Sequence, residues 1–375
     1  MNQLALPAPD IAGENPRFLS EQIITYIGNK RTLLPFIGRG LDIAKRRLSK
    51  NKLRLLDIFS GSGIVSRYFK RHAEHIIAND LEEYSKISNL CYLSNASDVD
   101  ADSLADTAGR LRAIIRTTLT PGFITELYAP KDEQNIRAED RCFYTRENAM
   151  FLDTAVNALA RLDERQRIYF LAPLLARASV HANTSGVFKG FHKNNRGIGQ
   201  FGGNARDALA RILGKIDIDV PVFSNFDCSF EVYQQDANAI VDKLPEVDVA
   251  YFDPPYNQHP YGSNYFMLNL LANYQRPAEM SKVSGIPTGW NRSRYNQRKE
   301  AGDALFELVE KVRAKHVLVS YNSEGFVSGE RFVHELQKIG KVDILETPYN
   351  TYRGSRNLQN RNMRVTEFLY LIEKH

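Results

Sequence analysis

In DVAYFDPPYNQHPYG, residues 248–262, an apolar run ends in two consecutive prolines. Each proline fixes φ and lacks an N–H donor, so no strand or helix continues through the pair. The first proline also favours an extended conformation at Asp253. We therefore expect a buried strand that ends in a stiff turn. The carboxylate of Asp253 and the phenol of Tyr256 then lie at the strand's carboxyl end, where ligands bind in open α/β sheets.

Four further short apolar runs alternate with helical patterns along the chain. They cover residues 53–63, 74–85, 230–237 and 315–326. Continuous apolar strands that alternate with helices are typical of a parallel sheet covered on both faces. The fold class that we predict is α/β, a doubly wound Rossmann-like sheet. Near the C-terminus, KVDILETPYNTYRG and VTEFLYLIEK predict two more strands as an antiparallel edge, joined by a polar, basic loop.

Residues 96–225 break this alternation, because helical periodicity dominates there and no strand–turn–helix unit is clear. We predict a mostly helical insertion at this place. The segments 21–95 and 226–375 then form the sheet domain together, and residues 1–20 form a flexible tail.

A basic loop lies inside the predicted insertion. Its charged residues are Lys189, Lys193, Arg196, Arg206, Arg211 and Lys215, against a single acid, Asp207. Phe188, Phe191 and Phe201 accompany them. Positive charge beside aromatic rings suits a nucleic-acid backbone and stacking on bases. A solvated loop between helices is the alternative.

The composition is that of an ordinary globular chain of 375 residues, and its net charge of +5 permits a polyanionic partner without requiring one. Three cysteines occur without a CxxC or Cys/His cluster, so we expect free thiols, no disulfide and no metal site. No apolar run reaches the ~18 residues of a membrane span. The N-terminus lacks the basic start and apolar core of a signal peptide. The expected compartment is the cytoplasm.

The stretch DIFSGSG, residues 57–63, predicts a ligand-binding turn after a strand. Its two glycines let the backbone approach a ligand closely. The third glycine of the dinucleotide fingerprint is missing, so a nucleoside with an amino-acid tail fits better than a pyrophosphate. Asp80, at the end of the next strand, is placed to accept from ribose hydroxyls, and Asp236 to accept from an adenine amino group. A tight turn and two helix N-caps are the alternatives.

The Asp-Pro-Pro-Tyr turn suits chemistry on an amino group of a planar base. Such an amine is a poor nucleophile, and it improves when acceptors hold its hydrogens and turn its lone pair toward an electrophile. Asp253 offers a carboxylate, Pro254 offers a fixed carbonyl, and Tyr256 offers a ring for stacking. The turn positions a substrate and attacks nothing covalently, so neither cysteine nor metal is needed. A proline-rich structural turn is the alternative.

Five motifs carry a family resemblance in their order along the chain: YIGNKRTLL, LLDIFSGSG, IIAND, QQDA and AYFDPPY. They resemble the motifs of the Dam-like, alpha-group N6-adenine-specific DNA methyltransferases. The resemblance implies a class I methyltransferase sheet with a target-recognition insertion. It also implies methyl transfer from S-adenosyl-L-methionine to N6 of adenine in double-stranded DNA, by base flipping, with S-adenosyl-L-homocysteine as the product and no metal.

The same resemblance assigns roles to individual residues. The implied cofactor-binding residues are Tyr26, Lys30, Asp57, Phe59, Gly61, Gly63, Asp80, Asp236 and Asp253. The implied catalytic residues, which hold the flipped adenine, are Asp253, Pro254, Pro255 and Tyr256. Tyr261 and Tyr265 are placed either to close over that base or, for Tyr265, to pack in the core.

Basic stretches are predicted to contact DNA. GWNRSRYNQRK and YRGSRNLQNRNMR flank the predicted site, and SGVFKGFHKN in the insertion resembles the family's basic recognition hairpin. The DNA-binding residues that we predict are Lys189, Lys193, Arg196, Arg292, Arg294, Arg353 and Arg356. Ordinary surface arginines are the alternative.

Several other functions remain open at this point. They are methylation of cytosine N4, of RNA or of a protein glutamine amide, and a DNA-binding module without catalysis. A dehydrogenase is disfavoured by the missing third glycine. The expected partners are double-stranded DNA and, within a restriction-modification system, a cognate endonuclease. The expected assembly is a monomer or weak dimer.

Overall fold

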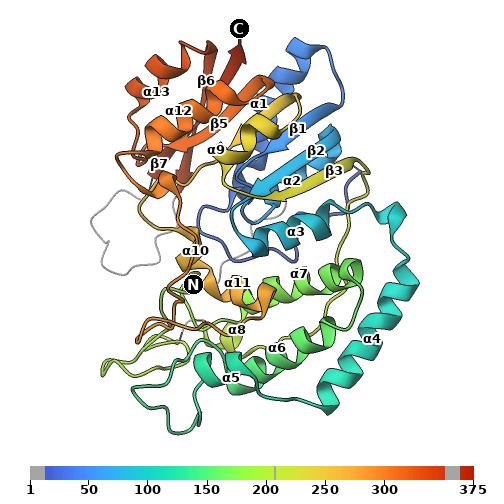
Figure 1. The fold of residues 1–375 in the computed structure, drawn as a ribbon, viewed down its shortest axis with the longest axis vertical. Helices are drawn as coiled ribbons and strands as arrows, with labels where there is room; N and C mark the ends of the chain where they lie inside the picture. Colours follow the sequence, from blue (N-terminus) through green and yellow to red (C-terminus); the bar gives the residue numbers. More distant parts are fainter. Residues whose placement is uncertain (1–12, 207, 351–363) are drawn as a thin grey trace.

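The computed structural model of the chain describes residues 13–206, 208–350 and 364–375. It places a sheet with helices on both faces above a helical part (Figure 1). The strands are β1 Leu53–Asp57, β2 Ala73–Asp80, β3 Ser229–Gln234, β4 Val247–Phe252, β5 Ala314–Asn322, β6 Gly340–Asn350 and β7 Arg364–Lys374.

These seven strands form one sheet in the order β3-β2-β1-β4-β5-β7-β6. β1 to β5 pair in parallel, and β7 runs antiparallel between β5 and β6. The predicted doubly wound sheet with an antiparallel edge is therefore confirmed. The strand order reverses between β1 and β4, so a crevice opens at their carboxyl ends.

Helices cover both faces of the sheet because alternate strand residues point to opposite sides. The helices of the sheet part are α1 Leu34–Leu48, α2 Ile64–Phe69, α3 Glu83–Leu93, α9 Ala237–Ile240, α12 Ala301–Lys311 and α13 Gly329–Leu336. Val249 and Leu318 pack with α1, α2 and α3, whereas Ala250 and Val317 pack with α9, α12 and α13. Short 3₁₀ helices are η1 Lys30–Leu33, η2 Lys70–His72, η3 Ala96–Asp98, η4 Val241–Lys243 and η5 Arg294–Asn296.

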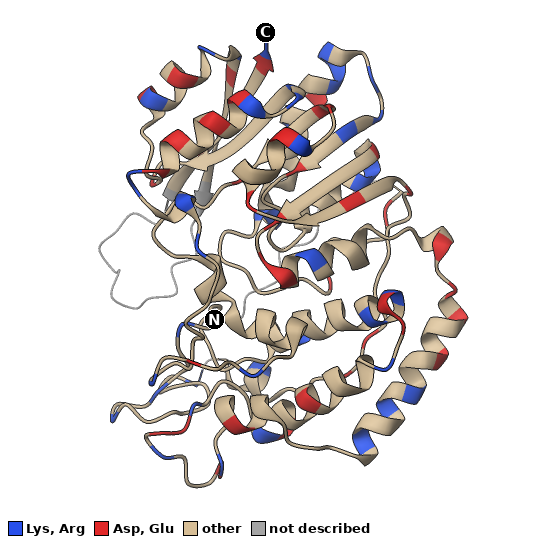
Figure 2. Cartoon of the chain, viewed as in Figure 1, with Lys and Arg blue, Asp and Glu red and all other residues tan. Residues whose placement is uncertain are grey.

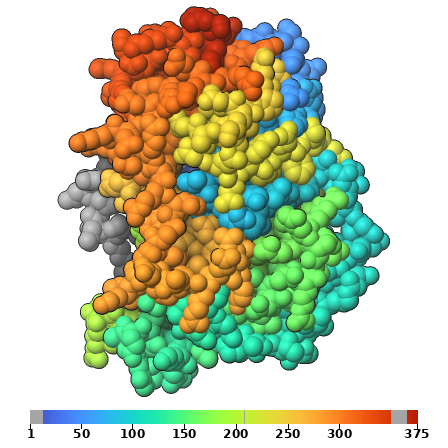
Figure 3. All heavy atoms as spheres, viewed as in Figure 1, coloured from blue at the N-terminus to red at the C-terminus, as the bar shows by residue number. Residues whose placement is uncertain are grey.

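The helical part is built from two segments of the chain. The predicted insertion supplies α4 Ala101–Thr117, α5 Phe123–Tyr128, α6 Arg146–Leu159, α7 Glu164–Val180 and α8 Leu209–Leu213. After the Asp-Pro-Pro-Tyr turn, α10 Tyr261–Asn264 leads into α11 Phe266–Asn273, which lies beside α7 (Figure 1). The segment that follows β4 crosses from the sheet part onto the helical part (Figure 3). The region expected to hold only the sheet domain therefore also contributes to the helical part.

Residues 13–20 pack against the sheet part instead of forming the expected tail. Phe18 and Leu19 are buried. The guanidinium of Arg67 on α2 lies 4.6 Å from the centroid of the Phe18 ring and donates hydrogen bonds to the carbonyls of Phe18 and Glu21. The prediction of a flexible tail is thus wrong for residues 13–20, and residues 1–12 lie outside the described part of the chain.

Cys91, Cys142 and Cys228 are free and buried, as expected from their spacing. Within the described ranges, no helix is both long and apolar enough to cross a membrane.

Candidate active site

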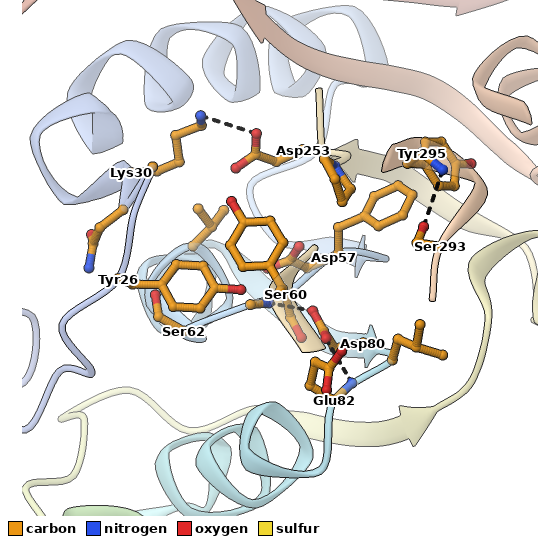
Figure 4. Close-up of a pocket in the computed structure, with 18 of the residues that line it drawn as sticks. Tyr26, Lys30, Asp57, Ser60, Ser62, Asp80, Glu82, Asp253, Ser293 and Tyr295 are labelled. Atoms are coloured by element: carbon orange, nitrogen blue, oxygen red, sulfur yellow. Dashed lines mark hydrogen bonds and ion pairs between the residues drawn. The ribbon is translucent and has the colours of Figure 1, made fainter. Parts of the chain in front are cut away.

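A pocket that is partly open to solvent lies at the carboxyl ends of β1, β2 and β4 (Figure 4). The structure brings together many of the predicted residues in its wall: Tyr26, Lys30, Asp57, Phe59, Gly61, Asp80, Asp236, Asp253 and Pro255. Gly63, Pro254 and Tyr256 are not among the lining residues. The pocket sits where the strand order reverses, which is the expected position for a ligand in such a sheet.

The turn after β1 needs its two glycines. Gly61 has φ +52°, and a Cβ there would lie 3.1 Å from the hydroxyl of Tyr26. Gly63 has φ +76° at the start of α2, and a Cβ there would lie 3.1 Å from Oδ1 of Asn89. Both conformations favour glycine. Gly61 lines the pocket, while Gly63 lies at the entry into α2. The close approach of this backbone to a ligand stays a prediction.

Asp80 and Asp236 line the pocket and also hold backbone amides. Asp80 accepts from the N–H of Gly61 at 2.8 Å and from that of Glu82 at 3.0 Å. Asp236 caps α9 by accepting from the N–H groups of Asn238 and Ala239. The helix-cap alternative for Asp236 is thus present in the structure, together with its position in the pocket.

Asp57 is a buried carboxyl with one oxygen engaged and one free. The hydroxyl of Ser66 donates to Oδ2 at 2.6 Å, whereas the buried Oδ1 has no hydrogen-bond partner among the described residues. Burial, reinforced by the nearby carboxylates of Asp253 and Asp80, raises the pKa of Asp57 to about 7. A buried acceptor without a partner is costly, so this pocket wall suits a cationic, hydrogen-bond-donating group.

Lys30 forms a buried ion pair with Asp253 (Figure 4). Its Nζ lies 3.1 Å from Oδ1 of Asp253, and the two side chains are 4% and 19% exposed. Burial alone would lower the pKa of Lys30, but Asp253 and Glu367 raise it well above its usual value. For Asp253, burial raises the pKa and the ammonium of Lys30 opposes that rise. The ammonium of Lys30 therefore holds the Asp253 carboxyl in place and counteracts the effect of burial on its pKa.

Tyr256 extends from the end of the same turn. Its ring centroid lies 5.8 Å from Nζ of Lys30 and 5.9 Å from that of Tyr321, in an edge-on arrangement. Tyr256 thus stands next to the pocket that holds Asp253.

An aromatic stack forms one side of the site. The ring of Tyr26 is stacked against those of Tyr261 and Tyr265, with centroids 4.9 and 4.7 Å away and interplanar angles of 14° and 15°. The rings of Tyr261 and Tyr265 are also nearly parallel, with centroids 5.9 Å apart. Tyr261 lines the pocket, whereas Tyr265 is fully buried. Of the two placements considered for Tyr265, packing in the core is the one that the structure shows.

Sequence reasoning missed Glu82, which lines the pocket and is 3% exposed. Burial raises its pKa to about 7. Its Oε2 accepts from the side-chain amides of Asn269 at 2.5 Å and Asn291 at 3.1 Å. Glu82 follows Asp80 by two residues and could have been suspected. Asn291 belongs to the basic stretch expected to flank the site, but its contact with Glu82, 209 residues away along the chain, was not expected.

Residues 290–296 form a wall of the pocket, whereas the sequence had predicted only DNA contacts for this stretch. Asn291, Ser293 and Tyr295 line it, while Arg292 is exposed and stacks 4.3 Å from the Trp290 ring. Tyr295 also contacts the ring of Phe59 edge-on, with centroids 4.9 Å apart. This alternation leaves Arg292 on the outer surface of a segment whose inner side faces the pocket.

The predicted DNA-binding residues have different surroundings. Lys189, Lys193 and Arg196 are exposed, and an antiparallel bridge between Lys193 and Gly199 marks a hairpin in this loop. Basic residues recur on the loops at the lower left of the helical part (Figure 2). Arg294 is already paired with Glu300 and Glu307. Arg353 and Arg356 lie outside the described residues.

Two residues expected to face a nucleic acid do not. Phe188 is 2% exposed and packs with Phe143 and Phe266 in the core, so it cannot stack on a base. The guanidinium of Arg211 donates to the carbonyls of Ala182 and Thr184, which makes it a structural cation. The sequence did not reveal these two roles, because it shows the charge and aromatic content of the loop but not which side chains the fold buries.

No group of three or more His, Cys, Asp or Glu side chains in the described ranges is arranged to hold a metal ion.

Comparisons with known proteins place the chain among DNA methyltransferases. A sequence model of the family "D12 class N6 adenine-specific DNA methyltransferase" matches residues 26–284. The Type II methyltransferase M.NlaIII of Neisseria lactamica is 27% identical over 94% of this chain and 99% of its own length. For M.CviAII of Paramecium bursaria Chlorella virus 1 the identity is 26%, over 93% of this chain and 98% of the relative. M.FokI of Planomicrobium okeanokoites is 28% identical over 93% of this chain, which spans only 52% of that relative.

Proposed function

Because the chain belongs to the D12 class of N6 adenine-specific DNA methyltransferases, we propose that it methylates N6 of an adenine flipped out of double-stranded DNA. The methyl donor is S-adenosyl-L-methionine. Relatives named as Type II methyltransferases support a modification role within a restriction-modification system, with a cognate endonuclease as a further partner. The observation that carries the proposal is the buried Lys30–Asp253 pair at the carboxyl end of β4, beside the glycine turn of β1.

The pocket residues fit this cofactor. The unpartnered Oδ1 of Asp57 is suited to accept from the ammonium of the methionine part. Gly61 keeps the turn free of a side chain, Asp80 and Glu82 offer carboxylates to the ribose, and Asp236 lies where an adenine amino group would be accepted. When bound, the cofactor supplies an electrophilic methyl group on its sulfonium. The protein's own task is to orient the two reactants.

The Asp-Pro-Pro-Tyr turn acts on the target base. Extruding an adenine costs a few kcal/mol, which stacking on Tyr256 partly offsets. Asp253 and the Pro254 carbonyl accept the two hydrogens of the amino group and direct its lone pair toward the methyl. The nitrogen gains positive charge as the bond forms, so the interaction with Asp253 is stronger in the transition state than in the ground state. Exposed cations such as Lys189 and Arg292 hold the phosphates.

We expect the affinity for S-adenosyl-L-methionine to fall as the pH drops below about 7. Burial raises the pKa of Asp57 to about 7, so the free enzyme must lose a proton there before Oδ1 accepts from the ammonium. Below that pH, each unit costs up to about tenfold in affinity. Calorimetric titrations in two buffers of different ionisation enthalpy will report the released proton.

Asp57→Asn provides the control for this titration. It removes the ionisation at Asp57 and should flatten the pH dependence at a lower overall affinity. Glu82→Gln tests the other pocket carboxyl whose pKa lies near 7. A pH dependence that survives in Asp57→Asn and disappears in Glu82→Gln would move the assignment to Glu82.

The proposed function is tested by incubating the protein with unmethylated genomic DNA and methyl-labelled S-adenosyl-L-methionine. Digested nucleosides are then separated by mass. We expect label in N6-methyladenine. Label in N4-methylcytosine would leave the proposed active site in place but make cytosine the target base. Label in RNA or protein alone, under matched conditions, would overturn DNA as the substrate.

A further inference from the structure

Ile27 is a large apolar side chain left 44% exposed at the edge of the candidate active site. Its chain neighbours Tyr26 and Gly28 line the pocket, whereas Ile27 does not. The exposed large hydrophobic residues of the described chain are Ile27, Ile114, Leu213, Val283 and Ile344. Single exposed apolar residues are common on protein surfaces. Ile27 differs from the other four because pocket residues lie on both sides of it in the chain, which places it at the rim.

The backbone of Ile27 is held from both ends. The N–H of Asn29 donates to the carbonyl of Tyr26 at 3.3 Å, so Ile27 and Gly28 are the central residues of a β-turn. Gly28 has φ +74°, the conformation that a type II turn requires at this position. The N–H of Ile27 donates to the Tyr265 hydroxyl at 2.7 Å, and its carbonyl accepts from the Tyr261 hydroxyl at 3.3 Å. Both rings belong to the aromatic stack with Tyr26, so the side chain projects from a braced turn.

This turn lies against the groups that would hold the target base. A Cβ on Gly28 would lie 3.7 Å from the Tyr256 hydroxyl and 3.6 Å from that of Tyr261. On the insertion side, Nζ of the exposed Lys189 lies 3.3 Å from Nδ1 of His259, three residues beyond Tyr256. The rim therefore presents an apolar side chain on the Tyr256 side and a cation beside the segment that follows the turn. That combination fits a duplex with its phosphates near Lys189 and its stacked bases near Ile27.

We propose that Ile27 is a wedge that enters the base stack at the position vacated by the target adenine. The inference rests on the proposed function. Extruding a base leaves an apolar gap between the neighbouring base pairs, and inserted aliphatic side chains are a known way for proteins to fill such gaps. An exposed isoleucine gains by burial in that gap, because apolar surface leaves water. The wedge thereby holds the base in the extruded position, in reach of Asp253 and Tyr256.

The test compares wild type and Ile27→Ala on duplexes carrying the mapped target, with S-adenosyl-L-homocysteine bound. In one duplex the target adenine is paired with thymine, and in the other it faces an abasic site. On the paired duplex we expect about tenfold weaker binding. When 2-aminopurine replaces the target adenine, its fluorescence should rise less with Ile27→Ala than with wild type. On the abasic duplex we expect a much smaller loss, because the base is already unpaired.

Two further variants separate a wedge from a general surface effect. Ile27→Met keeps an aliphatic side chain and should retain binding and flipping. Ile344→Ala removes an isoleucine that is 45% exposed on β6 and should match wild type on both duplexes.

Three results would overturn the wedge. They are unchanged binding and fluorescence in Ile27→Ala, an equal loss on the two duplexes, and a loss of S-adenosyl-L-homocysteine binding, which would make Ile27 part of the cofactor pocket. The proposed function fails separately, when the wild-type protein leaves adenine unmethylated.

Discussion

Asp253→Ala is expected to slow methyl transfer by about 10²–10³-fold, or about 3–4 kcal/mol of transition-state stabilisation. Asp253 directly follows the buried strand β4, and its carboxylate is oriented by Lys30 at 3.1 Å. Its interaction with the amino nitrogen strengthens as that nitrogen gains positive charge, so its loss affects the rate more than binding. A single-turnover measurement with labelled cofactor and excess enzyme will isolate the chemical step from product release.

Binding measurements and a matched control accompany this rate. S-adenosyl-L-homocysteine and DNA affinities should stay close to those of wild type, which excludes misfolding as the cause. Asp242→Ala removes a carboxylate whose side chain is 63% exposed, in η4, and should leave the rate unchanged. Near-normal turnover in Asp253→Ala would exclude Asp253 as a holder of the amino group and leave the turn a structural element.

The convergence of the acidic residues in the pocket followed from the sequence. Asp57, Asp80, Asp236 and Asp253 each come at or just after the end of an apolar run that forms a parallel strand. Parallel strands bring their carboxyl ends to one edge of the sheet, so local patterns sufficed to place these residues together. The glycine turn followed for the same reason, since φ preference is a local property.

Contacts that depend on distant segments were beyond the sequence. Glu82 meets Asn291, and Phe188 is buried against Phe266, through the path of the chain after β4. That path carries α11 onto the helical part, which periodicity within either segment does not reveal. Charge and aromatic content predicted a nucleic-acid surface around residue 188. Tertiary packing decides which side chains are buried, however, and it places Phe188 in the core.

Lys30→Met should destabilise the protein by about 3–5 kcal/mol near pH 8, because it leaves buried carboxylates without their cation. The ammonium of Lys30 faces Asp253 and Glu367, and Glu367 on β7 is 2% exposed. Without it, the pKa values of both carboxyls rise further above those of the unfolded chain. The folded variant then binds more protons than the unfolded chain, so its deficit relative to wild type grows as the pH rises. Denaturant unfolding at pH 5 and pH 8 will measure that difference.

Activity measurements and a double variant test whether the effects of Lys30→Met come from the lost charge or from the changed shape of the side chain. Without the ammonium of Lys30 the pKa of Asp253 rises further, and a protonated carboxyl accepts poorly from an amino group, so the pH–rate profile of Lys30→Met should shift to higher pH. Lys30→Met/Asp253→Asn should regain part of the stability, because one uncompensated carboxyl is gone, and should transfer methyl as slowly as Asp253→Ala, because the proposed holder of the amino group is gone as well. Lys338→Met, at an exposed lysine paired with Glu335, should alter neither property. Wild-type stability in Lys30→Met at pH 8 would mean that solvent, and not Lys30, balances the charge of Asp253.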